Sequence, residues 1–74
     1  MTQVLDTKGL NCPLPILKAK KALGGIAAGE TLEVHATDPG AVADFEAFCR
    51  QTGHELVESS RDGDVFKFFI KHAA

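Results

Sequence analysis

The chain lacks several residue types that usually carry chemistry or packing. It has no tryptophan and no tyrosine, so five phenylalanines supply all of its aromatic packing. Its two cysteines, Cys12 and Cys49, do not form a Cys-x-x-Cys pair, which argues against a thioredoxin-like dithiol. Three scattered histidines (His35, His54 and His72) show no metal-ligand spacing with them, so we expect no metal site.

Excess charge and long apolar runs are also absent. The net charge is −2, which argues against a nucleic-acid binder, because phosphate contacts need clustered Lys and Arg. No stretch is long or apolar enough to cross a membrane, and residues 1–6 lack the basic and apolar pattern of a signal peptide. We therefore expect no nucleic-acid or membrane partner, a cytoplasmic location with reduced thiols, and one domain over residues 1–74.

The most informative element is the run Cys12-Pro13-Leu14-Pro15, which Asn11 precedes. Proline is tolerated in the first turn of a helix, where backbone N–H groups have no intrahelical partner. The run therefore predicts a loop–helix boundary shaped by Asn11, Pro13 and Pro15. A helix N-terminus favours negative charge, and the thiolate is the nucleophilic form of cysteine. Cys12 is accordingly the candidate catalytic residue, with a small buried cysteine as the alternative.

The same prolines limit the hydrogen bonds available to a thiolate. Pro13 and Pro15 have no N–H group to donate, which leaves the amides of Leu14 and Ile16. The pKa of Cys12 is therefore expected to fall less than at a proline-free helix start. A moderate pKa suits a thiol that acts both as a nucleophile and as a leaving group, because nucleophilicity falls with the pKa.

Lysines cluster around this segment of the sequence. Lys8, Lys18, Lys20 and Lys21 lie close to Cys12, whereas the acidic residues mostly follow later. We consider Lys8, Lys18 and Lys21 candidate contacts for an acidic partner protein, which would act mainly on the association rate. The alternative is an ordinary solvated helix face.

The remaining polar candidates have less reactive interpretations. Cys49 falls on the apolar stripe of a helix and is expected to pack in the core, with a resolving cysteine for Cys12 as the alternative. His35 and His54 are expected in surface or cap roles, although either one is also a possible acid–base partner for a thiol. His72 lies near the chain end, where we expect fraying.

Hydrophobic periodicity predicts six elements. In chain order they are a strand over 4–7, a helix over 13–23, a strand over 30–37, a helix that begins at Asp38-Pro39 and ends before Gly53, and strands over 54–60 and 65–71 joined by a turn centred on Asp62-Gly63. Two helices of this length cover one sheet face only. The predicted fold is thus an α/β (α+β) two-layer sandwich of order β-α-β-α-β-β, in which a four-stranded mixed sheet carries both helices on one face and its crossovers are right-handed.

The same periodicity predicts which residues face the core. Strand residues should alternate between faces, and helix residues should recur every three or four positions. The expected core positions are Ile16, Ala19, Leu23, Ile26, Leu32, Val34, Ala36, Val42, Phe45, Phe48, Cys49, Phe66, Phe68 and Ile70.

Short motifs also occur in a familiar order along the chain. They are Leu5-Asp6, Gly9-Leu10, Cys12-Pro13-Leu14-Pro15, Gly29-Glu30-Thr31-Leu32, Asp38-Pro39, Phe48-Cys49, His54-Glu55-Leu56 and Asp62-Gly63. In this order they resemble the TusA/SirA family of small sulfur carriers over nearly the whole chain. The Cys-Pro-x-Pro element is the specific part of the resemblance.

The resemblance implies a β-α-β-α-β-β sandwich and a role in sulfur transfer without an organic cofactor. A cysteine desulfurase or a rhodanese-type donor would pass sulfane sulfur to Cys12. The persulfide would then go to an acceptor protein, either a DsrE-like protein or a Tus-type complex. The sulfur would end in 2-thiouridine of tRNA, in molybdenum cofactor maturation or in sulfur oxidation. Segments 36–40 and 44–48 look more like the sulfur-oxidation branch.

Two other classes of function remain open at this stage. One is a thiol redox sensor that forms a Cys12–Cys49 disulfide, which requires the two Cα atoms to lie within about 7 Å. The other is a non-catalytic interaction module, in which Cys12 is no more reactive than a free thiol. Whether a sulfurtransferase-type carrier counts as an enzyme also stays open.

Overall fold

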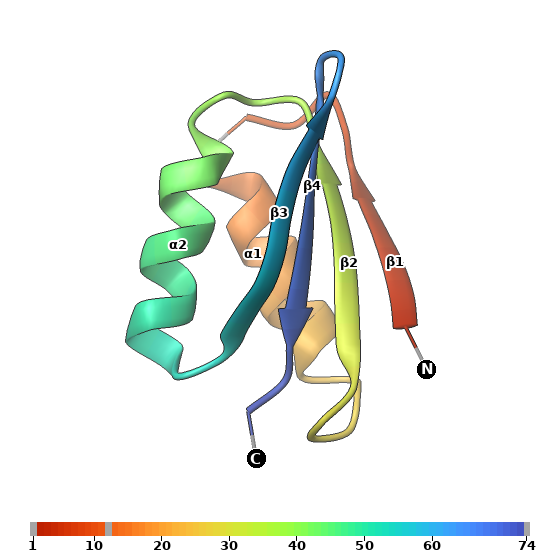
Figure 1. Ribbon diagram of the computed structural model, residues 1–74, viewed down its shortest axis with the longest axis vertical. Helices are drawn as coiled ribbons and strands as arrows, with labels where there is room; N and C mark the ends of the chain where they lie inside the picture. The colour runs from red at the N-terminus through yellow and green to blue at the C-terminus, as the bar shows by residue number, and fades with distance from the viewer. Residues whose placement is uncertain (1, 12, 74) are drawn as a thin grey trace.

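Six elements follow one another in this computed structural model, which describes residues 2–11 and 13–73. They are β1 (Thr2–Thr7), α1 (Leu14–Leu23), β2 (Thr31–Ala36), α2 (Ala41–Thr52), β3 (Glu55–Asp62) and β4 (Val65–Lys71) (Figure 1). The predicted order β-α-β-α-β-β is confirmed. No helix in the described part of the chain is both long enough and apolar enough to span a membrane.

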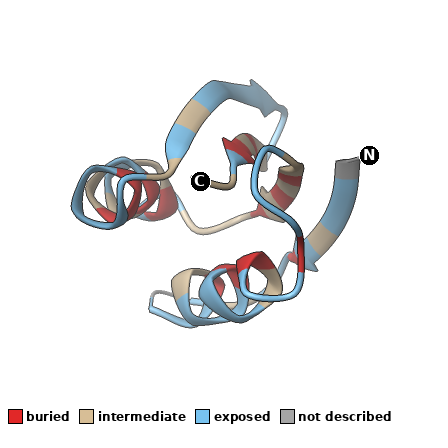
Figure 2. Cartoon of the chain, turned by 90° about the horizontal axis from the view of Figure 1, so that it is seen from below, coloured by how far each residue is buried: buried red, intermediate tan, exposed pale blue. Residues whose placement is uncertain are grey.

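The four strands form one mixed sheet with the order β1-β2-β4-β3. β1 pairs with β2 in parallel, and β4 pairs with both β2 and β3 antiparallel. Both helices cover one face of this sheet, with their buried residues turned toward it (Figure 2). The mixed sheet and its single helical layer are therefore as predicted. Because both β-α-β units step the same way across the sheet, the two crossovers share one hand.

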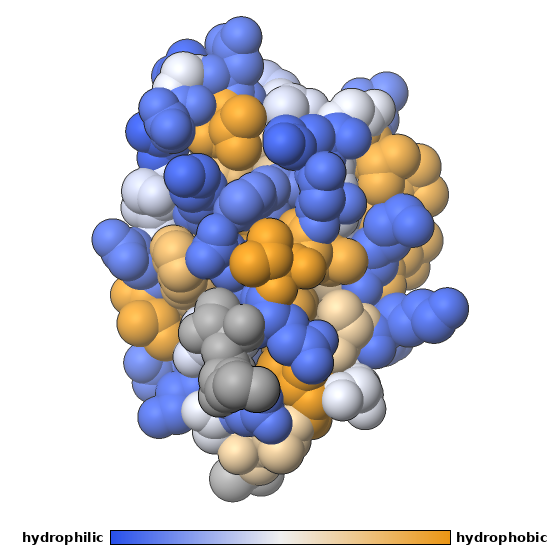
Figure 3. Space-filling view, turned by 90° about the vertical axis from the view of Figure 1, so that its right-hand side faces the viewer, coloured by the Kyte–Doolittle hydropathy of each residue, from blue (hydrophilic) through white to orange (hydrophobic). Residues whose placement is uncertain are grey.

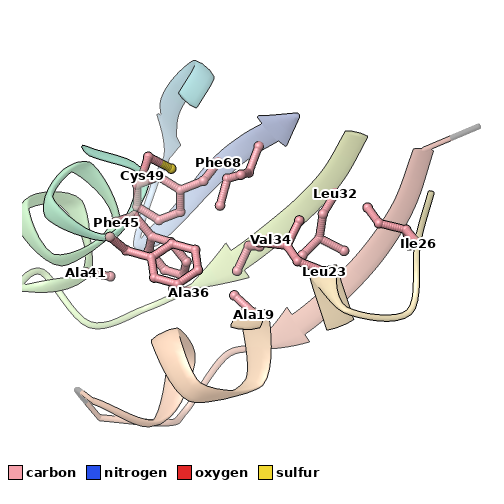
Figure 4. Close-up of a cluster of buried hydrophobic side chains, with 12 residues drawn as sticks. Ala19, Leu23, Ile26, Leu32, Val34, Ala36, Ala41, Phe45, Cys49 and Phe68 are labelled. Atoms are coloured by element: carbon pink, nitrogen blue, oxygen red, sulfur yellow. The ribbon is translucent and has the colours of Figure 1, made fainter. Parts of the chain in front are cut away.

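Phenylalanines from the helical layer and the sheet meet in the core (Figure 4). The ring of Phe45 stacks on that of Phe68 with centroids 4.7 Å apart, and Phe48 meets Phe45 edge-on at 6.4 Å. Such pairs add about 0.5–1.5 kcal/mol each beyond the apolar area that they bury. The alternation predicted for β2 is also confirmed, because Leu32 and Val34 are fully buried while their neighbours are half-exposed.

The buried stripe of α1 differs from the expected one. Pro15, Ala19 and Leu23 face the core at a spacing of four residues, whereas Ile16 is only partly buried. Ile26 is buried but follows the helix. The reason is that α1 carries more apolar residues than one stripe can hold, so its periodicity alone did not fix which set turns inward. Pro15 thus belongs to the core as well as to the helix start.

The second helix begins later than predicted. Regular α-helix starts at Ala41, after a turn that contains Pro39 and Gly40. In that turn the carboxylate Oδ1 of Asp38 accepts the N–H of Gly40 at 3.1 Å, and its carbonyl accepts the N–H of Ala41 at 3.0 Å. Asp38 therefore supplies the expected polar acceptor one turn ahead of the helix. The helix ends at Thr52, before Gly53 as predicted, and Gly53 caps it with a left-handed φ of +82°.

The β3–β4 hairpin is displaced by one residue from its predicted position. β3 runs to Asp62, which pairs with Val65, so the two-residue turn is Gly63-Asp64 and is not centred on Asp62-Gly63. Gly63 has a φ of +61°, and every described residue with a positive φ is a glycine. Glycine first in a two-residue turn is the type II′ pattern, whose twist matches the flanking strands.

Candidate functional site

The connection from β1 to α1 is held in place by hydrogen bonds at its start. The N–H of Gly9 donates to Thr37 Oγ1 at 2.9 Å, and the N–H of Leu10 donates to the Thr7 carbonyl at 3.2 Å. Thr7 is fully buried, and its hydroxyl donates to the carbonyl of His35 at 2.6 Å. Gly9 has a φ of +83°, a conformation that L side chains rarely adopt. The connection is therefore anchored to the end of β2.

Cys12, the predicted nucleophile, lies outside the described residues. Its sequence neighbours Asn11 and Pro13 are both exposed. Pro13 directly precedes α1, and Pro15 is the second residue of that helix. The predicted helix start next to Cys12 is therefore confirmed. α1 has no acidic residue in its first turn and carries Lys20 and Lys21 in its last turn. Its positive end consequently has no carboxylate of its own to offset it.

One of the two amides expected to serve a thiolate is engaged elsewhere. The N–H of Leu14 donates to the Asn11 carbonyl at 2.9 Å, across the position of the cysteine in the sequence. Asn11 therefore contributes a backbone acceptor that closes a turn ahead of α1. The expectation that the Leu14 amide is available to bind a thiolate is wrong, because this amide already donates to the Asn11 carbonyl.

Exposed apolar residues follow the motif on the surface of α1, and the sequence analysis missed them. The side chains of Leu14 and Leu17 are 46% and 55% exposed, and they lie one turn apart on the helix. A shallow groove of about 240 Å³ adjoins the same end of α1; it is lined by Pro13, Ile16, Asp44, Ala47, Phe48 and Gln51. The sequence did contain a sign of this exposure, because α1 has more apolar residues than one buried stripe can hold.

The structure brings together only part of the predicted lysine cluster. Lys18 and Lys21 line one shallow groove of about 360 Å³ between α1 and β1, with Gln3, Leu5, Ala22 and Gly25. Lys20 is exposed on α1 but does not line this groove, and Lys8 is exposed in the connection after β1. Of the four clustered lysines, Lys18 and Lys21 thus form a pair beside β1, whereas Lys8 and Lys20 are separate surface charges.

Cys49 packs in the core, as predicted. It is 5% exposed and belongs to the cluster that contains Phe45 and Phe48. Burial raises the pKa of its thiol above the ordinary value of 9.0. The thiolate of Cys49 is therefore disfavoured in the folded protein.

The end of α2 and the end of β4 lie at the far end of the molecule from the start of α1 (Figure 1). His54 and His72, which follow these two elements, form a pair. Their ring centroids are 4.9 Å apart, and His54 also lies 5.9 Å from Phe48. The expected fraying of His72 is wrong, since its backbone bonds the segment ahead of β2 through Gly29 at 3.0 Å and Glu30 at 2.8 Å. Burial, followed by the charge of His72, lowers the pKa of His54 below 6.5.

His35 lies on the other face of the sheet. Its neighbours Val34 and Ala36 point into the core, so the imidazole points away from both helices. It pairs with the carboxylate of Glu33 on the same face and stands opposite Lys67 of β4. Neither His35 nor His54 is therefore placed at the start of α1. Among residues 2–11 and 13–73, no three metal-ligating side chains cluster.

Comparison with known proteins agrees with this arrangement. The model of the family described as sulfurtransferase TusA matches residues 3–72. The chain is 59% identical over 69 residues to the sulfur carrier protein TusA of Allochromatium vinosum, which covers 93% of this chain and 91% of that one. It is 55% identical over 71 residues to a putative sulfur carrier protein of Neisseria meningitidis serogroup A, with 96% of each chain covered.

A solved structure shows the same fold. The crystal structure of a SirA-like protein from Desulfitobacterium hafniense superposes with a TM-score of 0.84 at 25% identity and covers 100% of both chains. The family match spans both helices and all four strands apart from the first residue of β1. It also includes the Cys-Pro-x-Pro run that precedes α1. The chain therefore belongs to the TusA family.

Proposed function

We propose that this protein is a sulfur carrier that accepts sulfane sulfur as a persulfide on Cys12 and relays it to an acceptor protein. The observation that carries the proposal is the Cys-Pro-x-Pro run directly ahead of α1 in a chain of the TusA family. Asn11 and Pro13, the two sequence neighbours of Cys12, are both exposed, so another protein can contact the chain on either side of it.

The transfer is a pair of thiol–persulfide exchanges. The thiolate of Cys12 attacks the outer sulfur of a donor persulfide, so that one S–S bond forms while the donor's S–S bond breaks and its thiolate leaves. The proton of the donor persulfide stays with the transferred sulfur. An acceptor thiolate then attacks that sulfur and releases the Cys12 thiolate. The number of S–S bonds is unchanged in each exchange, so neither step needs an oxidant, a metal or an organic cofactor.

The start of α1 supports this chemistry electrostatically. The helix has ten residues and no carboxylate in its first turn, so its positive end favours the thiolate form of a neighbouring thiol. The engagement of the Leu14 amide with Asn11 removes one direct donor. The pKa of Cys12 is accordingly expected to be lowered only moderately, which suits a thiol that is nucleophile in one step and leaving group in the next.

The partners are proposed from the chemistry of the two exchanges. The donor must present a protein persulfide, as a cysteine desulfurase or a rhodanese does. The acceptor must present a thiolate, as a DsrE-like protein or a Tus-type complex does. Leu14 and Leu17 are exposed apolar side chains that follow Cys12 in the sequence, and Lys8, Lys18 and Lys21 are the cationic side chains that we propose as docking contacts. Sulfur oxidation, tRNA 2-thiolation and molybdenum cofactor maturation are the proposed destinations.

The proposal is tested by intact mass after incubation with a cysteine desulfurase and cysteine. We expect the wild type to gain the mass of one sulfur, and that mass to be lost on treatment with a thiol reductant. The reductant step is essential because a sulfinic acid has nearly the same added mass and is not reversed by thiols. The Cys12→Ser variant should show no gain, and Cys49→Ala should load like the wild type.

Loading of the Cys12→Ser variant would overturn the proposal. If the wild type fails to load from this donor while a control acceptor does load, thiosulfate with a rhodanese is the second donor to apply. Failure with both donors also contradicts sulfur carriage. The redox-sensor alternative has less support, because a Cys12–Cys49 disulfide has to use a thiol that is buried among Phe45 and Phe48.

A further inference from the structure

The two edges of the sheet are protected to different degrees. An edge strand presents unpaired N–H and C=O groups to which another chain can add, and proteins block such edges with charges, proline or bulges. β3 has several of these features, because its register shifts between Leu56 and Glu58 and its sequence includes charged residues at both ends. Its eight residues therefore form a poor template for a further strand.

β1 has none of the usual protection apart from its modest length. It contains no lysine, arginine or proline, and its six residues pair with β2 in one unbroken register. Its only charged residue, Asp6, accepts the N–H of Lys8 through Oδ1 at 2.9 Å. Val4 is 62% exposed, and apolar patches lie between polar side chains on the side of the molecule where β1 runs (Figure 3).

A groove runs beside this edge on the helical side. Gln3 and Leu5 of β1 form one wall, and Lys18, Lys21 and Ala22 of α1 form much of the other. The side chains of a strand alternate between the two faces of a sheet. A strand added to β1 would place every second side chain in this groove and the others beside Val4 on the open face.

The charge of the groove indicates what kind of segment fits. Lys18 and Lys21 are its charged side chains, and no acidic residue lines it in the described part of the chain. A second copy of the protein paired through its own β1 would bring a second α1 with Lys18 and Lys21 against the first pair. That arrangement places like charges together, which disfavours it, whereas an acidic segment pairs with both lysines.

We infer that the outer edge of β1 binds an extended acidic segment of a partner protein as a fifth strand of the sheet. Backbone hydrogen bonds to β1 would provide the affinity, and Lys18 and Lys21 would select acidic side chains on the helical side. The site shares Lys18 and Lys21 with the docking contacts proposed above, but it uses neither Cys12 nor Leu14 and Leu17. It is tested without any sulfur donor, so its failure is distinguishable from a failure of sulfur carriage.

The first experiment titrates the full chain with a short capped peptide in which valine and glutamate alternate. Backbone amide shifts and hydrogen exchange are followed by NMR. We expect the largest shifts in β1 and in the α1 residues of the groove, together with slower exchange of β1 amides that otherwise face solvent. A peptide with lysine in place of glutamate should bind at least tenfold more weakly. Equal binding of both peptides, or shifts centred on β3, would overturn the inference.

N-methylation separates strand addition from simple charge attraction. Two further peptides carry N-methyl groups on alternate residues in the two possible frames. Only one edge of an added strand faces β1, so one frame should abolish binding and the other should preserve it. Equal binding of both N-methylated peptides would show that the backbone is not paired and would contradict the proposed mode.

The lysines provide a matched pair of variants. Lys18→Glu combined with Lys21→Glu should weaken binding of the valine–glutamate peptide at least tenfold, because both groove charges are reversed. Lys20→Glu reverses one exposed charge outside the groove on the same helix and should change binding less than threefold. Thermal unfolding of both variants checks that the fold is kept. A dimer that forms without peptide and slows exchange of the β1 amides would assign this edge to a second copy and overturn the inference.

Discussion

The Nδ1 atom of His54 accepts the backbone N–H of Ala73 at 2.9 Å, so an imidazole ahead of β3 fastens the end of the chain. His72 adds a ring contact to the same cluster and bonds the segment before β2 through its backbone. The nitrogen of His54 that accepts this bond must be unprotonated. The attachment is therefore coupled to pH.

Lowering the pH below about 6.5 should reduce the free energy of unfolding, because His54 becomes protonated. Its folded-state pKa is lowered by burial and by His72, so the unfolded chain binds the proton more readily. Stability from neutral His54 is fully present above the unfolded-state pKa of 6.5 and is lost as the pH falls through the folded-state value. Urea unfolding of the wild type and of His54→Phe should differ by about 0.5–1.5 kcal/mol at pH 8. The difference should shrink as the pH falls below 6.5 and through the lowered pKa of folded His54, and a constant difference would contradict this role.

The two cysteines should respond oppositely to substitution. Cys12→Ser should abolish persulfide loading and leave the melting temperature within a few degrees of the wild type. Cys49→Ala should load normally and lose about 1–2 kcal/mol of stability, because it leaves a small cavity beside Phe45 and Phe48. Mass spectrometry and urea unfolding measure the two effects. A Cys49→Ala protein that melts normally but loads poorly would place Cys49 in the chemistry.

Replacing Leu17 with aspartate should slow sulfur exchange with a donor protein while preserving the fold. Leu17 is 55% exposed, so its loss costs the folded chain little, but a partner that buries it loses an apolar contact. We expect a fall in loading rate of about tenfold, which corresponds to ~1.4 kcal/mol. Val57→Asp is the control, because Val57 is 53% exposed and lies on β3. Equal slowing by both variants would remove Leu17 from the docking surface.

Alanine at Gly9 and at Gly24 should change stability in opposite directions. A Cβ at Gly9 meets no atom within 4 Å, yet its φ of +83° should still cost about 1–2 kcal/mol. Gly24 has a φ of −65°, so alanine there should be neutral or stabilise by up to about 1 kcal/mol. Urea unfolding measures both differences. A destabilised Gly24→Ala protein would indicate that the close approach to the Lys21 carbonyl, at 3.4 Å, decides the outcome.

The sequence was sufficient for element order and for the strand faces, because the side-chain period of two in β2 and β4 leaves one choice of inner face. It was less decisive for α1, where apolar residues lie on more than one side, and so the exposure of Leu14 and Leu17 was missed. α2 starts two residues after the predicted Asp38-Pro39 start, and the hairpin turn is displaced by one residue, so both are boundary errors. Attachment of His72 depends on Gly29 and Glu30, far away in sequence, and no local pattern reveals it.

The central position of β4 has a consequence for how the chain is built. β4 is the last strand to be synthesised, yet it separates β2 from β3 and contributes Phe68 and Ile70 to the core. On a ribosome, β1, α1 and β2 emerge first and can pair locally, whereas β3 has no neighbour until the C-terminal segment arrives. We therefore expect the sheet to close only when β4 is available. Truncation within β4 would remove the middle of the sheet, not an edge of it.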